Sequence, residues 1–141
     1  MPEIGKLLFV YGTLLSAATT VTGRSQRARL SRQAQSLGSA STEGVLYNLG
    51  RYPGLVLPVA AGEIVHGELL ELTSPSLTLR WLDAYEGIVP GEHPHNDYER
   101  LQRPVVTSAG AVVTAWVYVF RASTASAAPI PGGNWLATRE I

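Results

Sequence analysis

The sequence predicts an α+β fold in which most of the strands curl into one small barrel. The first observation is a continuous apolar run at 6–12 that ends in glycine, which is typical of a strand buried on both faces. The second is a set of strand-like runs that are rich in β-branched and apolar residues. These runs are residues 41–50, 63–72, 99–108 and 111–120. The third is that the stretch 73–87 carries the clearest helical pattern of the chain.

The size and composition indicate a single domain over residues 1–141. The 141 residues are 45% hydrophobic and 16% charged, which is enough to bury a core without metals or crosslinks. The chain has no cysteine, and this excludes a disulfide framework, a thiol nucleophile and a cysteine-based zinc site.

The charge balance argues against two classes of partner. The 11 Lys and Arg residues equal the 11 Asp and Glu residues, so no net charge attracts nucleic acid or an acidic membrane.

No apolar run is long enough for a signal peptide or a bilayer span. We therefore expect a soluble, cytoplasmic protein.

In the first half of the chain, Arg, Gln and Ala between Ser25 and Leu37 predict a short surface helix that ends at Gly38. A phosphate-binding patch is one interpretation of its arginines, and a solvated helix face is the favoured one. These arginines are Arg24, Arg27, Arg29 and Arg32.

The sequence RYPG at 51–54 predicts a turn, in which Pro53 presets φ and Gly54 supplies a positive φ. A short strand is expected at 55–60, and Pro58 indicates that it lies at a sheet edge.

The predicted helix at 73–87 has a start and a stop signal. Ser74 can cap it, and Pro75 then takes the first helical position, where its missing N–H costs nothing. An apolar stripe is expected on one face, and Gly87 ends the helix in a left-handed conformation. The stripe consists of Leu77, Trp81, Leu82 and Tyr85. After this helix, Ala109-Gly110 predicts a hairpin turn between the last two strands.

Glu86 lies in the last turn of this helix, where the negative end of the helix dipole disfavours a carboxylate. If the corner faces a cavity, desolvation and the helix end both raise the pKa of Glu86, and a raised pKa makes a better general base near neutral pH. If the corner faces solvent, Glu86 is inert. The spacing alone leaves both interpretations open.

The end of the first strand offers a second candidate. Gly12 removes a side chain where the backbone turns, so the N–H groups of Gly12, Thr13 and Leu14 could face a concavity as an anion or oxyanion site. The alternative is an ordinary turn at the end of a strand.

Other candidate sites are weaker. His93, His95 and Asp97 could hold a metal ion, but a plain surface loop is the favoured interpretation. His66 is expected to be an ordinary strand residue. The chain has no GxSxG, GxGxxG or P-loop motif, which argues against a serine hydrolase elbow and a nucleotide loop.

A series of motifs resembles the γ-glutamylcyclotransferase-like family, which includes the γ-glutamylamine cyclotransferases and AIG2-like proteins. The motifs occur in order along nearly the whole chain: FVYGTL at 9–14, GVLYNLGRYPGLV at 44–56, HGELLEL at 66–72, LDAYEG at 82–87, YER at 98–100, WVYVF at 116–120 and GGNW at 132–135. The resemblance implies a small mixed β-barrel flanked by helices, with a cavity at one end.

The resemblance also implies a reaction: release of 5-oxoproline from a γ-glutamyl amine, peptide or metabolite, without a cofactor or a metal. The α-amino group of the substrate attacks its own γ-carbonyl, so the enzyme mainly has to hold the reactive pose. Glu86 would be the general acid and base. The backbone of Tyr11, Gly12, Thr13 and Leu14 would hold the glutamyl carboxylate or the oxyanion.

Three further positions carry over from the family. Tyr118 corresponds to a tyrosine near the glutamyl head group, while Tyr98 and Arg100 match a YxR element that we interpret as structural. We expect Arg100 to pair with Asp83, because pairing with Glu86 would lower the pKa of the base. Thr13 replaces the Ser of several members, and the loop at 88–97 is expected at the pocket rim.

Two alternatives to an enzyme remain at this level. One is a non-catalytic module on the same barrel that binds or senses a small anion. The other is an interaction protein that dimerises through an edge strand. The oligomeric state and the group attached to the γ-carboxylate are left open.

Overall fold

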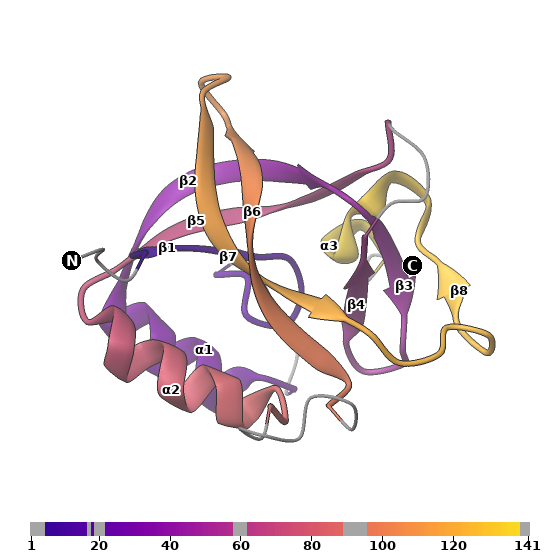
Figure 1. The fold of residues 1–141 in the computed structure, drawn as a ribbon, viewed down its shortest axis with the longest axis horizontal. Coiled ribbons are helices and arrows are strands. Elements are labelled where there is room, and N and C mark those ends of the chain that lie inside the picture. Colours follow the sequence, from indigo (N-terminus) through magenta and orange to yellow (C-terminus); the bar gives the residue numbers. More distant parts are fainter. Residues whose placement is uncertain (1–4, 17, 19–21, 58–61, 89–95, 139–141) are drawn as a thin grey trace.

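Five strands close into a barrel in the computed structural model, which describes residues 5–16, 18, 22–57, 62–88 and 96–138 (Figure 1). Their order around the barrel is β1-β5-β2-β6-β7, and pairing of β1 with β7 closes it. The strands are β1 (Leu7–Val10), β2 (Ala34–Glu43), β5 (Ile64–Leu72), β6 (Tyr98–Thr107) and β7 (Val112–Phe120). The closing pair is parallel and the other four are antiparallel, so the predicted mixed barrel is confirmed.

Three shorter strands extend the sheet beyond β7. They are β4 (Pro53–Val56), which runs parallel to β7, then β3 (Val45–Asn48) and β8 (Ala128–Pro129). A 3₁₀ turn (Pro131–Gly133) and the short helix α3 (Trp135–Thr138) follow β8. Trp135 from this segment is 1% exposed and packs into the core of the barrel.

The barrel wall separates two hydrophobic cores. The inner core contains Phe9 and Val117, whereas their strand neighbours Leu8 and Tyr118 pack in an outer core beneath the helices. Helices α1 (Arg24–Gln33) and α2 (Pro75–Tyr85) lie along that outer face (Figure 1). Strand β1 is thus buried on both faces, as its continuous apolar run predicts.

The predicted end of the first helix is wrong. The helix ends at Gln33, and Ala34–Leu37 belong to β2, which pairs with β5 along its whole length. Gly38 lies inside this strand, at a register shift with φ of 100°, and does not end a helix. Long-range pairing with β5 outweighs local helix propensity here. The strand expected at 41–50 is divided, because β2 ends before Gly44 and β3 begins after it.

The turn expected at 51–54 lies slightly earlier. Gly50 has the positive φ of 111°, and its N–H donates to Asn48 Oδ1. Pro53 and Gly54 already belong to β4. Gly54 is needed for space, because a Cβ there would lie 2.9 Å from the side chain of Phe120. The prediction of an edge strand is also wrong, since β4 lies between β7 and β3; Pro58 lies outside the described residues.

Helix α2 matches its predicted limits and all but one residue of its predicted apolar stripe, since Trp81, Leu82 and Tyr85 pack in the outer core. Pro75 is its first residue and Gly87 follows it with φ of 77°, as expected. Ser74 occupies the N-cap position without a capping hydrogen bond from its side chain. The buried side chains are Thr78, Leu79 and Leu82, while Leu77 is 52% exposed, so this leucine does not belong to the stripe.

The hairpin between β6 and β7 is confirmed, with Gly110 at φ of 88°.

Within the described part of the chain, no helix has the length and apolar character needed to cross a bilayer.

Gly67 tests the close contact between β5 and the end of β1. A Cβ at this position would overlap the carbonyl oxygen of Val10 and lie 2.7 Å from the Phe9 ring. We expect Gly67→Ala to lower the free energy of unfolding by about 1–3 kcal/mol, because overpacking forces the backbone to shift. His66→Ala on the same strand is the control, since His66 is exposed. Equal urea midpoints for both variants would contradict the expectation.

Candidate active site

A cavity of about 230 Å³ lies where β1 ends, between that end of the barrel and the end of α2. Residues 9–14 form one side, Tyr85 and Glu86 another, and the beginnings of β4 and β6 a third. Tyr98 and Tyr118, which line it, belong to the outer core, whereas Phe9 and Tyr11 belong to the inner core, so the cavity lies where the two layers meet at the end of β1. All of the predicted site residues line this one cavity: Tyr11, Gly12, Thr13, Leu14, Glu86 and Tyr118.

The way α2 ends fixes the position of Glu86. Glu86 is the C-cap residue, and its own N–H donates to the Leu82 carbonyl at 2.9 Å. The N–H of Gly87 donates to Ala84 at 3.1 Å, and that of Ile88 donates to Asp83 at 2.8 Å. This pair of bonds is the Schellman arrangement, which requires the left-handed conformation that Gly87 supplies. Gly87 therefore ends the helix in a conformation that leaves Glu86 on the cavity wall.

The environment of Glu86 raises its pKa to about 7. Burial of the carboxylate is the larger cause, as the sequence predicts, and the negative charge of Asp83 is the second. The contribution of Asp83 to the pKa of Glu86 is missing from the sequence-based prediction, although the i, i+3 spacing of the two residues is a signal for it. None of the hydrogen bonds or ion pairs among the described residues involves the Glu86 carboxylate.

The loop after β1 forms a turn whose central residues border the cavity. The N–H of Leu15 donates to the Gly12 carbonyl at 3.0 Å. Such a bond leaves the two central N–H groups, here those of Thr13 and Leu14, outside the turn's own hydrogen bond. Neither donates to another group in the described residues. A Cβ on Gly12 would lie 2.7 Å from the Pro53 ring, so glycine allows β4 to approach this loop.

Two charged residues anchor the loop after β1 through hydrogen bonds of their side chains. Arg27 of α1 donates to the Thr13 carbonyl at 2.6 Å. Glu68 of β5 accepts hydrogen bonds from both the N–H and the hydroxyl of Ser16, at 2.9 and 2.7 Å. Neither anchor could be predicted from the sequence, because each contact joins two segments that only the fold brings together.

Three tyrosines of the cavity wall have their hydroxyl protons engaged elsewhere. Tyr11 donates to the carbonyl of Tyr118 at 2.6 Å, and Tyr98 donates to the carbonyl of Pro53 at 3.1 Å. Tyr118 itself donates to Asp83 Oδ1 at 2.7 Å. Burial raises the pKa of all three phenols, so they stay protonated at neutral pH. Their oxygens can accept hydrogen bonds from a ligand, but their protons already have acceptors.

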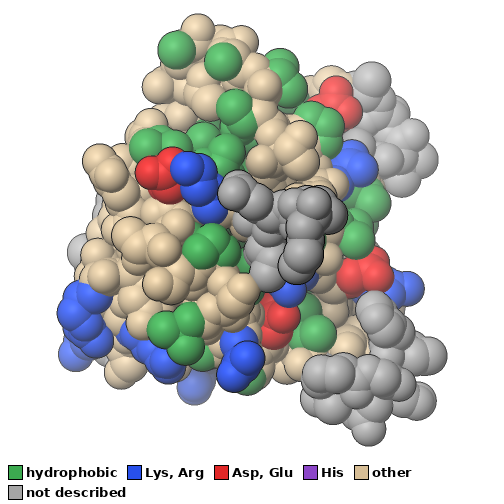
Figure 2. All heavy atoms as spheres, turned by 60° about the vertical axis from the view of Figure 1, so that its left-hand side comes forward, with side chains coloured by type: hydrophobic (Ala, Val, Ile, Leu, Met, Phe, Trp, Pro, Cys, Tyr) green, Lys and Arg blue, Asp and Glu red, His purple; other side chains and the backbone are tan. Residues whose placement is uncertain are grey.

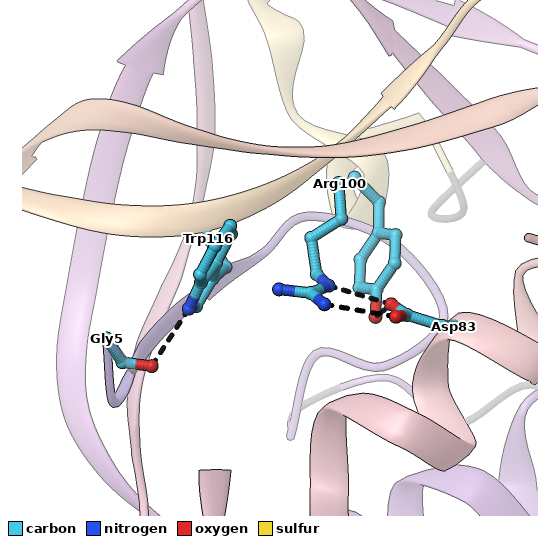
Figure 3. Close-up of polar contacts among 5 residues, drawn as sticks. Gly5, Asp83, Arg100 and Trp116 are labelled. Atoms are coloured by element: carbon cyan, nitrogen blue, oxygen red, sulfur yellow. Dashed lines mark hydrogen bonds and ion pairs between the residues drawn. The ribbon is translucent and has the colours of Figure 1, made fainter. Parts of the chain in front are cut away.

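The expected pairing of Arg100 is confirmed (Figure 3). Its Nε lies 2.8 Å from Asp83 Oδ1 and its Nη2 lies 3.1 Å from Oδ2, and it makes no ion pair with Glu86. The guanidinium also lies over the Trp116 ring, 4.3 Å from its centre. Tyr98, interpreted from the sequence as structural, also lines the cavity.

The remaining candidates lie elsewhere or have other partners. Figure 2 shows Lys and Arg side chains gathered along the lower part of the molecule, where the two helices lie. Among the arginines of α1, Arg29 stacks on the Trp81 ring at 4.5 Å and Arg27 donates to the Thr13 carbonyl, so both have structural contacts. His66 is exposed on β5, away from the candidate active site.

The proposed metal ligands of the 88–97 loop are only partly described. His93 and His95 lie outside the described residues, whereas Asp97 lines the cavity. The described residues contain no group of three side chains that could hold a metal ion.

Comparison with known proteins gives consistent results. The protein family described as Gamma-glutamyl cyclotransferase, AIG2-like matches residues 8–137. A Vibrio cholerae serotype O1 protein, named as a candidate gamma-glutamylcyclotransferase, is 35% identical over 131 residues, which cover 92% of this chain and 94% of that protein.

Two solved structures share the fold. An AIG2-like protein from Mus musculus has a TM-score of 0.66 at 24% identity, with 88% of this chain and 82% of that chain covered. YkqA from Bacillus subtilis has a TM-score of 0.68 at 23% identity. The match covers 96% of this chain but only 41% of YkqA, so the chain spans about two fifths of that protein.

The raised pKa of Glu86 predicts a pH-dependent cost in stability. Between pH 4.5 and pH 7 an unfolded Glu86 loses its proton while the folded one keeps it, so rising pH favours unfolding, and the whole cost is present above pH 7. We expect Glu86→Gln to stabilise the fold by about 3 kcal/mol at pH 8, and the gain to shrink towards zero as the pH falls to 4.5.

Urea unfolding of both proteins at pH 5 and pH 8 measures this difference. Glu71→Gln is the control, because Glu71 makes an exposed ion pair with Lys6 and does not line the cavity. A gain that is equal at both pH values would contradict the raised pKa.

Proposed function

The chain belongs to the gamma-glutamyl cyclotransferase, AIG2-like family, and we propose that it releases 5-oxoproline from a γ-glutamyl amine, peptide or metabolite. The observation that carries the proposal is the meeting, across one cavity, of a carboxylate with a pKa of about 7 and the turn of residues 12–14. The proposal includes a reaction without a cofactor and a cytoplasmic location, both taken from the sequence and its resemblance.

In the proposed reaction Glu86 first takes a proton from the α-ammonium of the substrate. The freed amine attacks the γ-carbonyl carbon and closes a five-membered ring, while the carbonyl oxygen takes up the negative charge. Glu86 then gives the proton to the leaving nitrogen as its bond to carbon breaks. The ring nitrogen still carries two protons, and it passes one through Glu86 to the released amine, so the products are 5-oxoproline and an ammonium ion. A pKa near 7 suits these transfers, because the group takes and returns a proton at neutral pH.

The turn after β1 would supply the electrostatic part of catalysis. The N–H groups of Thr13 and Leu14 are suited to an anion, either the α-carboxylate of the glutamyl unit or the oxyanion. Tyr118 offers only acceptor lone pairs, because its proton goes to Asp83, and acceptors suit an α-ammonium. Ring closure is intramolecular, so holding this folded pose supplies much of the rate.

The size of the cavity favours enclosure of the glutamyl unit alone. Its volume of about 230 Å³ is below the roughly 300–1,000 Å³ of pockets that enclose drug-sized ligands. The leaving amine would therefore extend to the rim, where Asp97 lies.

Glu86→Gln tests the catalytic role directly. Loss of a general acid and base is expected to lower kcat by about 10²–10⁴-fold. A panel of γ-glutamyl amines and peptides should be assayed for 5-oxoproline, with Glu71→Gln as the control. For the parent enzyme, kcat/KM should rise with pH through about 7, as Glu86 loses its proton.

Two outcomes would overturn this proposal. Equal turnover by Glu86→Gln and the parent would remove Glu86 from the mechanism. Thermal stabilisation by glutamate-like ligands, with no 5-oxoproline after long incubation, would favour the non-catalytic binding module.

Gly12→Ala tests the turn. The added Cβ would lie 2.7 Å from the rigid Pro53 ring, so the loop must move. A displacement of about 1 Å in the reacting pose is expected to lower kcat/KM by about 100-fold. Gly110→Asn is the control, because that turn lies at the far end of the β6–β7 hairpin, has nothing within 4 Å, and has a positive φ that Asn tolerates. Unchanged kcat/KM in Gly12→Ala would argue against a role for this turn.

A further inference from the structure

We propose that Asp83 and Arg100 form a positioning pair, which sets the electrostatic field at Glu86 and fixes the Tyr118 hydroxyl on the cavity wall. The inference rests on the proposed function only where Glu86 is taken as the base. The pair itself is defined by contacts among described residues.

Asp83 stands three residues before Glu86, so both carboxylates lie on the same face of the end of α2. The Asp83 carboxylate accepts three hydrogen bonds. Two come from the Arg100 fork, at 2.8 and 3.1 Å, and one comes from the Tyr118 hydroxyl at 2.7 Å. Glu86, by contrast, has no such bond within the described part of the chain. The helix thus carries one fully bonded carboxylate next to one that is left for a ligand.

Arg100 is held in place by more than its ion pair. Figure 3 shows its guanidinium between the Trp116 ring and the Asp83 carboxylate. Trp116 is fixed in turn, because its indole N–H donates to the Gly5 carbonyl at 2.8 Å. The side chains of Arg100 and Asp83 are only 22% and 24% exposed. Stacking and a two-pronged bond therefore direct the cation to Asp83 and away from Glu86.

The two members of the pair act on Glu86 with opposite signs. The negative charge of Asp83 disfavours the Glu86 anion. Because Arg100 is bonded to Asp83, we infer that its positive charge offsets part of that effect. The other titratable groups that line the cavity around Glu86 come from every surrounding element. They are Tyr11 after β1, Tyr52 before β4, Tyr85 on α2, Asp97 and Tyr98 at the start of β6, and Tyr118 on β7. Asp97 is the one further carboxylate among these described lining residues.

This arrangement predicts opposite responses to two substitutions. Asp83→Asn removes the negative neighbour and keeps Arg100, so the midpoint of the Glu86 titration should fall by about 1 pH unit. Arg100→Gln removes the cation and leaves Asp83 uncompensated, so the same midpoint should rise by about 1 pH unit. Arg100→Lys keeps the charge without the fork and should stay near the parent value.

NMR titration of the Glu86 carboxyl carbon in ¹³C-labelled protein measures these midpoints. Loss of the signal in Glu86→Gln assigns it. Glu71→Gln is the control, because it removes a carboxylate of β5 that makes an exposed ion pair and does not line the cavity. In the active enzyme, the pH at which kcat/KM rises should move in the same two directions.

The outcomes separate the possible roles. If the variants lose stability but keep the parent midpoint, the pair is structural and the inference is wrong. Shifts of the same sign in Asp83→Asn and Arg100→Gln would also overturn it. If Arg100→Gln fails to fold, Asp83→Asn alone still decides, because an unmoved or raised midpoint contradicts the inference. If the midpoints move as expected but no γ-glutamyl compound is turned over, the positioning pair stands and the proposed function fails.

Discussion

The parallel pairing of β1 with β7 closes the barrel, and it places the loop after β1 and the residues that support Arg100. Leu8 lies opposite Trp116 in this pair. Because the pair is parallel, the two strands run in the same direction and end on the same side of the barrel. The loop at 11–14 therefore starts beside Tyr118. The same pairing sets Gly5, just before β1, beside Trp116. One strand contact thus locates both the backbone turn and the support of Arg100.

The barrel wall serves the core and the cavity at the same time because side chains alternate along each strand. Phe9 and Val117 fill the interior, while Val10 and Tyr118 face the helices. Tyr11 joins these layers, since its hydroxyl donates to the Tyr118 carbonyl and accepts from the N–H of Leu55 at 3.2 Å. Two hydrogen bonds offset the cost of burying that hydroxyl, and they tie β1, β7 and β4 together below the cavity.

Local signals allowed part of this structure to be predicted, and long-range contacts determined the rest. The limits of α2, with Pro75 at its start and Gly87 after its end, follow from rules that act within one turn. The start of β2 does not, because Ala34–Leu37 are extended only through pairing with β5. Similarly, Leu77 and Leu79 both fit a helical period, and only the position of the barrel decides that Leu79 is buried. Glu86 and the 11–14 loop could be identified from motifs, whereas the anchors Arg27 and Glu68 required the fold.

The contrast between Asp83 and Glu86 explains why a carboxylate occupies an unfavourable place. Both lie at the negative end of α2, where stability alone would favour Lys or Arg. Asp83 is compensated by hydrogen bonds from Arg100 and Tyr118. Glu86 is enclosed beside Asp83 without a partner among the described residues, which raises its pKa to about 7. Two carboxylates three residues apart thus have opposite environments, one bonded on every side and the other enclosed without such bonds. Under the proposed function, the second is the group that exchanges a proton. The raised pKa of Glu86 lowers the stability of the fold at neutral pH, and the same raised pKa suits Glu86 to take and return a proton.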